Sequence, residues 1–263
     1  MIRTRLLAPL MLSTATLFAL PQIAVAGQGS ATAGQQQSPA AASSGETSSG
    51  APDAAQYSEA NRLLLVNPHL SNIKRPVTLT YSFKKEGTLQ KDGFSDTIVL
   101  KVLKLRSDGM KAAQVRWFSG DRKKVIGNDY TDENPIIPMI LQRDVMELDK
   151  LTKGHNFRWH YFQHRVKVAL QTEAKVTPVT IEFEGKKIAA KKIRVAPYLT
   201  DPKRPLYPAY ADEYYEFIGS KDIPGWIYQT RAVIPGKNDD GKADPKLKPG
   251  LDETVTLHKV EYQ

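Results

Sequence analysis

Apolar and polar residues alternate along most of the chain after residue 76, in short runs separated by glycine, proline and aspartate. In the first run, Val77, Leu79, Tyr81 and Phe83 alternate with polar residues, which predicts a strand with one buried face and one solvated face. Because the runs follow one another with few helical patterns between them, they predict an antiparallel meander and not βαβ units. The predicted strands lie over residues 77–84, 97–106, 111–118, 125–126, 157–170, 177–184, 187–196, 212–220, 226–235 and 253–262.

Two of these strands are joined by Lys-Asp-Ile-Pro-Gly at residues 221–225, a connection that predicts a hairpin. By strand alternation, Trp226, Tyr228, Thr230, Ala232 and Ile234 of its second arm fall on one face. A hairpin alone is marginally stable in water, so we expect the preceding strands to extend it into a larger sheet.

Helical spacing is found in two places. Residues 58–65 predict one or two helical turns with Ser58 as N-cap. A longer apolar pattern starts at Asn134-Pro135 and stops near Gly154, and we expect this helix, residues 134–153, to lie across one face of the sheet. Residues 157–170 fit either a strand or a helix, and the alternation near their end favours a strand. The predicted fold class is mainly β, of the α+β type: a curved antiparallel sheet or half-barrel covered by one main helix.

The chain divides into three parts by composition. Residues 1–26 have a basic start, an apolar run and an Ala-Val-Ala site, which predicts a signal peptide cleaved after Ala26; an uncleaved anchor is the alternative. Residues 27–55 are rich in Gly, Ser, Ala and Gln and are expected to form a disordered tether. Residues 56–263 are expected to form a single periplasmic domain.

The chain is basic and has no cysteine, with 37 Lys and Arg against 28 Asp and Glu. The absence of cysteine excludes disulfides and a lipidated N-terminal cysteine. A net charge of +9 on an exported domain favours anionic partners, either lipid head groups or an acidic protein, although ordinary solubility explains it equally well. Nucleic acid does not fit the compartment, and membrane contact is expected to be peripheral at most.

Short motifs add a resemblance to a family. They are the Tyr-x-Phe strand at Tyr81–Phe83, the Asn134-Pro135 helix, the strand over 186–197 that ends in Val-Ala-Pro, and Ile-Pro-Gly-Trp-Ile-Tyr at 223–228. In this order the elements resemble the LolA-like periplasmic half-barrels. The resemblance implies either a concave face that binds an acyl chain of a lipid or lipoprotein, or a protein with no known activity. The loops at 197–208 and 236–250 depart from the lipoprotein carrier itself.

Aromatic and aliphatic side chains from several predicted elements are expected to converge. They line either a filled core or a ligand cavity beneath the helix. The residues of this hypothetical cavity are Tyr81, Phe83, Trp117, Met139, Ile140, Phe217, Trp226 and Tyr228.

A second group combines basic, histidine and aromatic residues, which predicts a surface for anionic head groups or for a partner. A metal site is the weaker interpretation, because the neighbouring cations repel a divalent ion and no carboxylate lies within the group. No metal or cofactor is therefore expected. The residues of this surface are Arg158, Trp159, His160, His164, Arg165 and Lys167.

Catalytic patterns are absent from the sequence. There is no Gly-x-Ser-x-Gly motif, and acidic pairs such as Asp212 and Glu213 are expected to be solvated, with ordinary acidity. The sequence therefore favours a non-enzymatic periplasmic protein that binds a hydrophobic ligand. The alternative is an envelope protein–protein interaction module with a filled core and a basic docking surface.

Overall fold

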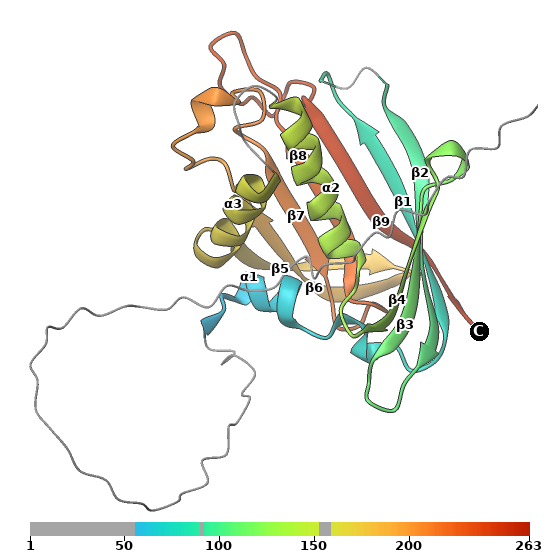
Figure 1. The fold of residues 1–263 in the computed structure, drawn as a ribbon. Helices are drawn as coiled ribbons and strands as arrows, with labels where there is room; N and C mark the ends of the chain where they lie inside the picture. The colour runs from blue at the N-terminus through green and yellow to red at the C-terminus, as the bar shows by residue number, and fades with distance from the viewer. Residues whose placement is uncertain (1–55, 90–91, 153–158) are drawn as a thin grey trace, which may run out of the picture. The chain divides into compact units, whose positions relative to one another are not determined.

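The computed structural model describes residues 56–89, 92–152 and 159–263. The predicted signal peptide, the predicted tether and Arg158 lie outside these residues. The described part is a curved, entirely antiparallel sheet with helices α1, α2 and α3 on one face (Figure 1). The predicted mainly β fold, with a curved sheet covered by a helix, is confirmed.

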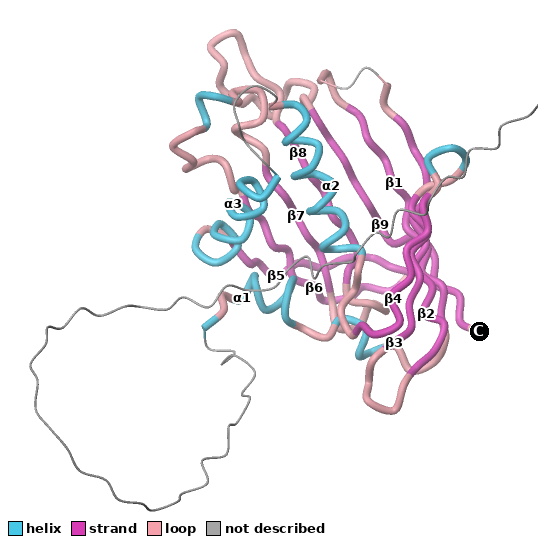
Figure 2. Tube along the Cα trace, in the orientation of Figure 1, coloured by secondary structure: helices cyan, strands magenta, loops and turns pink. Residues whose placement is uncertain are grey.

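Nine strands form the sheet in the order β4-β3-β2-β1-β9-β8-β7-β6-β5. The first and last strands of the chain, β1 and β9, pair with each other near the middle of the sheet. The sheet stays open, with β4 and β5 as its two edges (Figure 2). The strands are β1 (Val77–Glu86), β2 (Phe94–Leu105), β3 (Lys111–Trp117), β4 (Lys124–Thr131), β5 (Lys175–Phe183), β6 (Lys186–Val195), β7 (Tyr214–Gly219), β8 (Ile227–Ile234) and β9 (Leu251–Tyr262).

Several strands bury alternate residues against the helices. In β1, Val77, Leu79, Tyr81 and Phe83 are buried, whereas the residues between them are partly or fully exposed. β3 and β7 repeat this alternation. The period of two predicted from the sequence therefore sets which face of the sheet the helices cover.

Helix α2 (Ile136–Leu151) begins where the Asn-Pro pair predicted it. Its apolar residues recur at helical spacing and turn Ile137, Ile140, Leu141 and Leu148 into the core. The predicted N-terminal turn is also present: α1 (Glu59–Asn61) continues as a π-helical turn over Arg62–Val66, and the Ser58 hydroxyl accepts a hydrogen bond from the Asn61 N–H at 3.1 Å.

The strand predicted over residues 157–170 is wrong, because the described part of this segment is helix α3 (Trp159–Thr172). Its buried residues are Phe162, Val166, Ala169 and Leu170, at helical spacings of four, three and one. The alternation of valines at 166 and 168 is a coincidence of composition within a helical period. The described chain therefore has two main helices, α2 and α3, which pack against each other.

The hairpin of β7 and β8 is interrupted by a β-bulge. Ile218 pairs with Gln229 and Gly219 with Ile227, so Tyr228 is an extra residue on its strand. The expected alternation of Trp226 and Tyr228 on one face is therefore wrong. The ring of Tyr228 instead lies edge-on to Phe183, with ring centroids 6.1 Å apart.

Glycine at position 219 makes room for the Trp226 ring. A Cβ at Gly219 would lie 2.5 Å from ring atoms of Trp226, which itself adopts a left-handed φ of 69°. We therefore expect Gly219→Ala to lower the free energy of unfolding by about 1–3 kcal/mol, because the buried ring must move. Urea denaturation followed by tryptophan fluorescence measures the loss.

The matched control is Gly127→Ala in β4, where an added Cβ meets open space. We expect this variant to be as stable as the parent or slightly more stable. Equal stabilities for the two variants would contradict the tight packing of Trp226 on Gly219.

Candidate functional site

The residues predicted to line a cavity are separated into three places. Phe83 packs with Phe94 and Phe118 at centroid distances of 5.0 and 4.7 Å, and Trp117 lies beside Phe118. Tyr81 and Trp226 lie near the start of α2, and Phe217 stacks on Tyr215 of the same strand. Six of the eight predicted residues are buried, namely Tyr81, Phe83, Trp117, Ile140, Phe217 and Trp226.

The other two predicted cavity residues are only half-buried: Met139 on α2 and Tyr228 on the bulge. The two best-formed hollows in the described part of the chain have other linings, with volumes of about 440 and about 190 Å³. The predicted cavity therefore stays a prediction. The larger hollow lies on the opposite face of the sheet from α2, and the smaller lies between the end of α2 and the loop at 206–210.

Charged side chains occupy the concave face beneath the middle of α2. The Lys85 ammonium of β1 is 2.7 Å from a carboxylate oxygen of Glu147 and 3.5 Å from one of Glu253. Arg143 of α2 donates to Glu253 of β9 and lies 3.7 Å from Glu147. Lys85 and Glu253 are buried, whereas the side chains of Glu147 and Arg143 are partly exposed.

Two further carboxyl groups join this cluster. Asp144 of α2 accepts a hydrogen bond from the Tyr215 hydroxyl, which lies 3.5 Å from the hydroxyl of Tyr198. The Glu213 side chain is 1% exposed, and its Oε2 has no hydrogen-bond partner among the described residues. The prediction that Glu213 is solvated is wrong, because the turn before β7 folds it under the helix.

Burial changes the acidity of both groups. It raises the pKa of Asp144 to about 7; the hydrogen bond from Tyr215 opposes this shift and the nearby Glu253 and Glu147 add to it. Burial and the charge of Asp144 raise the pKa of Glu213 well above its usual range. The cluster holds four carboxyl groups and two cations, so its charges balance when Asp144 and Glu213 each carry a proton. We name the four carboxyls with Lys85 and Arg143 the α2 charge cluster.

A neutral hydrogen-bonded network fixes the other end of α2. Asn134 is fully buried, and its amide donates to the Gly225 carbonyl at 2.8 Å and to the Tyr81 hydroxyl at 3.3 Å. Its side-chain oxygen accepts from the Ile136 N–H at 3.0 Å, which caps the helix. The Asn134 N–H donates to His69 Nδ1, and His69 Nε2 donates to the Leu63 carbonyl. Sequence analysis recognised Asn134 as a cap but not as the link between the helix and the hairpin.

The predicted anion surface lies on α3. His160 and His164 are exposed, and Trp159 stacks on His160. Arg165 is turned toward the following loop, where it donates to the Pro197 carbonyl and to Thr200 Oγ1 and lies 3.5 Å from Asp201. Burial lowers the pKa of Lys167. The helix thus presents histidines to solvent, while Arg165 holds the loop in place.

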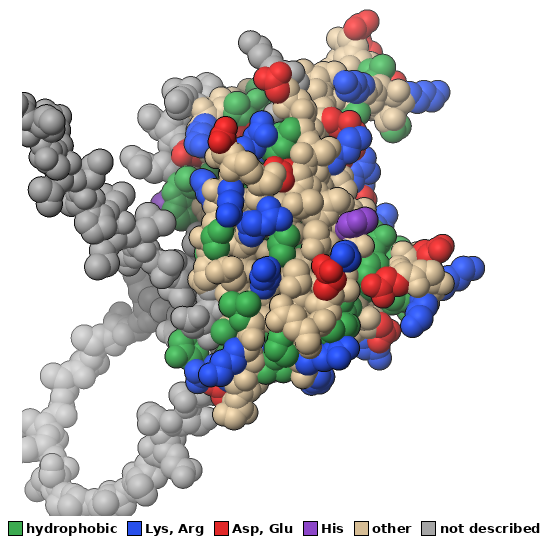
Figure 3. Space-filling model, turned by 90° about the vertical axis from the view of Figure 1, so that its right-hand side faces the viewer, with side chains coloured by type: hydrophobic (Ala, Val, Ile, Leu, Met, Phe, Trp, Pro, Cys, Tyr) green, Lys and Arg blue, Asp and Glu red, His purple; other side chains and the backbone are tan. Residues whose placement is uncertain are grey.

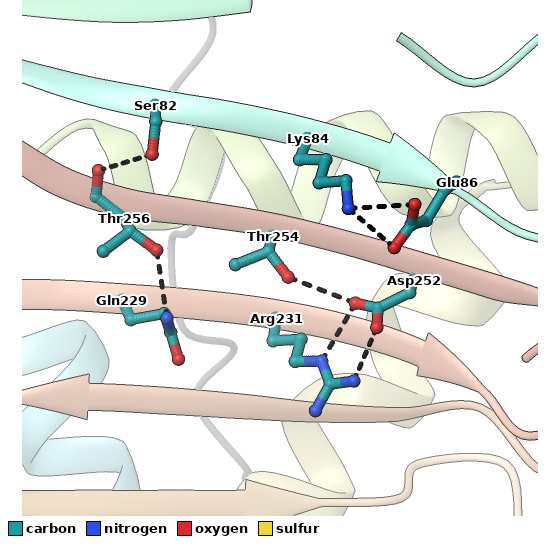
Figure 4. A pocket seen from close by; sticks show the side chains of 8 residues that line it. All are labelled: Ser82, Lys84, Glu86, Gln229, Arg231, Asp252, Thr254 and Thr256. Atoms are coloured by element: carbon teal, nitrogen blue, oxygen red, sulfur yellow. Dashed lines mark hydrogen bonds and ion pairs between the residues drawn. The ribbon is translucent and has the colours of Figure 1, made fainter. Parts of the chain in front are cut away.

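The larger hollow is an open polar groove on the convex face. Arg231 binds Asp252 through two hydrogen bonds of 2.9 and 2.5 Å, and Gln229 donates to Thr256 at 3.0 Å. Figure 4 shows that these side chains rise from three adjacent strands, with the helices behind the sheet. Because its charges are paired with each other, the groove offers hydroxyl and amide groups more than free charge. Its lining is Ser82, Lys84, Glu86, Gln229, Arg231, Asp252, Thr254 and Thr256.

The described residues contain no group of three or more His, Asp or Glu side chains placed to hold a metal ion. None of their helices combines the length and the apolar character needed to cross a membrane.

No protein-family model and no curated protein matches the chain. Among solved structures it is similar to MucB in complex with MucA(peri), at 12% identity and a TM-score of 0.34. It is also similar to the MucA/MucB complex of Pseudomonas aeruginosa, at 13% identity and a TM-score of 0.33. In both cases 78% of this chain is aligned, and it spans 56% and 57% of the matched chains.

Two further similar structures come from the group that the sequence resembles. One is a domain named for outer-membrane lipoprotein sorting from Vibrio parahaemolyticus, at 9% identity, with 78% of this chain and 93% of that chain covered and a TM-score of 0.27. The other is a LolA superfamily protein from Nitrosomonas europaea, at 9% identity, the same coverage and a TM-score of 0.18. At these scores the similarities support no inference about ligand or partner, which must come from the residues of this chain.

Asp144 makes stability depend on pH. In the unfolded chain it loses its proton near pH 3.8, whereas in the folded chain it keeps the proton up to about pH 7. The native state therefore binds the extra proton, and this contribution to the free energy of unfolding falls by on the order of 3 kcal/mol as pH rises from about 4 to about 7. We expect Asp144→Asn to remove this contribution, so that the difference in urea midpoint between about pH 5 and about pH 8 becomes smaller than in the parent.

Asp252→Asn is the control for this pH dependence. Burial raises the pKa of Asp252, but hydrogen bonds from Arg231 and Thr254 outweigh it and leave the pKa lowered. Its contribution is therefore lost only as pH falls below the usual aspartate range, and the control should leave the difference between about pH 5 and about pH 8 unchanged. An unchanged difference in Asp144→Asn would show that Asp144 is ionised in the folded chain.

Asn134→Ala removes the oxygen that caps α2 and the amide group that donates to the Gly225 carbonyl and the Tyr81 hydroxyl. We expect a loss of about 2–3 kcal/mol in the free energy of unfolding, because the Gly225 carbonyl and the Ile136 N–H remain buried without their partners. The control is Asn238→Ala in an exposed loop, where Asn238 accepts from the Lys242 N–H and its loss should cost less than about 1 kcal/mol. Equal losses in urea denaturation would contradict the linking role of Asn134.

Proposed function

We propose that the chain is a non-enzymatic binding protein of the bacterial cell envelope that engages a partner protein through its outer, basic surface. Export to the periplasm is supported by the signal-peptide pattern of residues 1–26. The absence of catalysis is supported by the enclosure of the two most perturbed carboxyls: Asp144 and Glu213 line neither of the two hollows.

The α2 charge cluster is the observation that supports a filled concave face. An acyl chain lying between α2 and the sheet would separate Lys85 of β1 from Glu147 of α2, and Arg143 of α2 from Glu253 of β9. Each separation costs free energy, because buried Lys85 and Glu253 each lose one of their two ion-pair partners. Hydrocarbon contacts would have to offset this loss before any net binding remained.

The outer surface offers charge without such a cost. Lys and Arg side chains spread over the side of the molecule where Figure 1 draws β2 (Figure 3). Exposed side chains of this kind attract an acidic partner over a distance of about one Debye length and lose little solvation on the way. The surface therefore favours a protein with an acidic face over a buried hydrophobic ligand.

Site-specific photo-crosslinking tests this function in intact cells. A photoreactive residue replaces half-buried Met139, which a ligand in the predicted cavity would touch, or exposed Lys104 on β2. If the concave face is filled, as we propose, irradiation should give a defined protein adduct at position 104 and no lipid adduct at position 139. Mass spectrometry of the purified adducts identifies them.

A lipid adduct at position 139 that is lost in Ile140→Trp would contradict the proposal. It would support instead the prediction of a hydrophobic ligand beneath α2. A photoreactive residue at Lys186, which is exposed at the turn between β5 and β6, is the control for adducts that form with any abundant envelope protein.

A further inference from the structure

One edge of the sheet, β4, has no further described strand beside it and carries exposed apolar side chains. β4 has β3 on one side only, and its described side chains include Val125, Ile126 and Tyr130, which are 49, 45 and 65% exposed. Gly127, in the middle of the strand, has open space where a Cβ would lie. The outward backbone N–H and C=O groups of such a strand are available to pair with another extended chain.

The opposite edge is protected, which makes the exposure of β4 informative. β5 carries Pro178 near its middle, and a proline has no N–H to offer to a further strand. α1 packs against β5 as well. β4 has no proline, and Lys124 at its first position is its only basic residue. Proteins normally block edge strands, so an edge left open with apolar side chains indicates a pairing surface.

The charge of the residues around β4 indicates what kind of segment would pair with this strand. Residues 101–131, which run from within β2 through β3 to the end of β4, contain eight basic residues and three acidic ones, a net charge of +5 out of +9 for the whole chain. Arg106 and Arg116 are engaged within the fold, by Asp108 and by the Phe118 carbonyl. Among the described residues, no acidic side chain forms an ion pair with Lys101, Lys104, Lys123 or Lys124.

From these observations we propose that the outer edge of β4 binds an extended, acidic segment of a partner protein, which adds to the sheet as a further strand. This inference rests on the proposed function and names its site and the chemistry of its partner. Main-chain hydrogen bonds along the edge supply affinity, and the lysines favour acidic side chains. A second copy of the chain fits less well, because it would bring the same basic residues against each other.

Synthetic peptides test the edge directly. The probe is a fluorescent peptide of alternating valine and glutamate, eight residues long like β4. Two matched peptides carry lysine in place of glutamate, or the same acidic sequence with N-methyl groups at alternate residues. N-methylation at alternate residues keeps the charge and the side chains but removes the N–H donors from one edge of the peptide. Because either edge of the peptide can face β4, both alternating patterns are made. Fluorescence anisotropy measures the affinity of each peptide for the whole mature chain.

The acidic peptide should bind at least about tenfold more tightly than the lysine peptide, and one of the two N-methyl patterns should weaken it by about tenfold or more. Lys123→Glu/Lys124→Glu should weaken the acidic peptide by a similar factor. The matched variant Lys186→Glu/Lys187→Glu changes the charge equally at exposed lysines next to the other edge, and it should have little effect.

Several results would overturn the edge site and would be distinguishable from failure of the proposed function. If the acidic and N-methylated peptides bind equally and both lysine pairs have equal effects, the peptide binds a diffuse basic surface. The proposal of a protein partner would then stand, but the partner would not pair with β4. Dimerisation of the chain in sedimentation, lost in Ile126→Lys, would show that a second copy occupies β4. Absence of peptide binding also overturns the edge site. Only the lipid adduct at position 139 would overturn the proposed function itself.

Discussion

The ion pairs between α2 and the sheet are the constraint on which the rest of the domain depends. A helix that covers a curved sheet normally buries apolar side chains alone, but α2 also turns Asp144 into the interface and sets Arg143 beside it. Lys85 and Glu253 rise from paired strands to meet it, at registered positions of β1 and β9. The helix is therefore positioned by directional contacts, and a shift along its axis would leave charges unpaired.

Proton binding is part of this constraint. Four carboxyl groups face two cations, and the net charge of the cluster is zero only while Asp144 and Glu213 hold protons. In the unfolded chain both groups would be ionised near neutral pH, so the chain takes up protons as it folds there. His69, at the start of the helix, acts in the opposite sense, because burial lowers its pKa and so makes the folded chain bind a proton there less readily than the unfolded chain. The groups beneath the middle of α2 and the histidine at its start therefore change the free energy of unfolding in opposite directions as pH rises.

The alternation of residues was enough to predict the sheet, because burial on one face imposes a period of two along β1, β3 and β7. The same rule failed where a helical period happened to contain alternating valines, in α3, and where a single extra residue changed the face of Tyr228. The site was harder to predict. Glu213 follows an aspartate in a polar turn, and nothing local to the sequence shows that β7 and α2 enclose it. The burial of Glu213 depends on residues that are distant in the sequence, and no periodic pattern around position 213 predicts it.

If the concave face is filled, as we propose, recognition falls to the parts of the fold that packing leaves open. The convex groove has its charges paired within itself, between Arg231 and Asp252 and between Lys84 and Glu86, so it adds little net attraction for a charged partner. β4 differs in both respects: its backbone groups lack a neighbouring strand on one side, and the lysines that precede it have no acidic partners among the described residues. Main-chain hydrogen bonds along an edge form with a segment of any sequence, whereas the lysines favour a segment with acidic side chains. Affinity and selectivity therefore come from different parts of the same strand and its neighbours, and each can be removed without disturbing the α2 charge cluster.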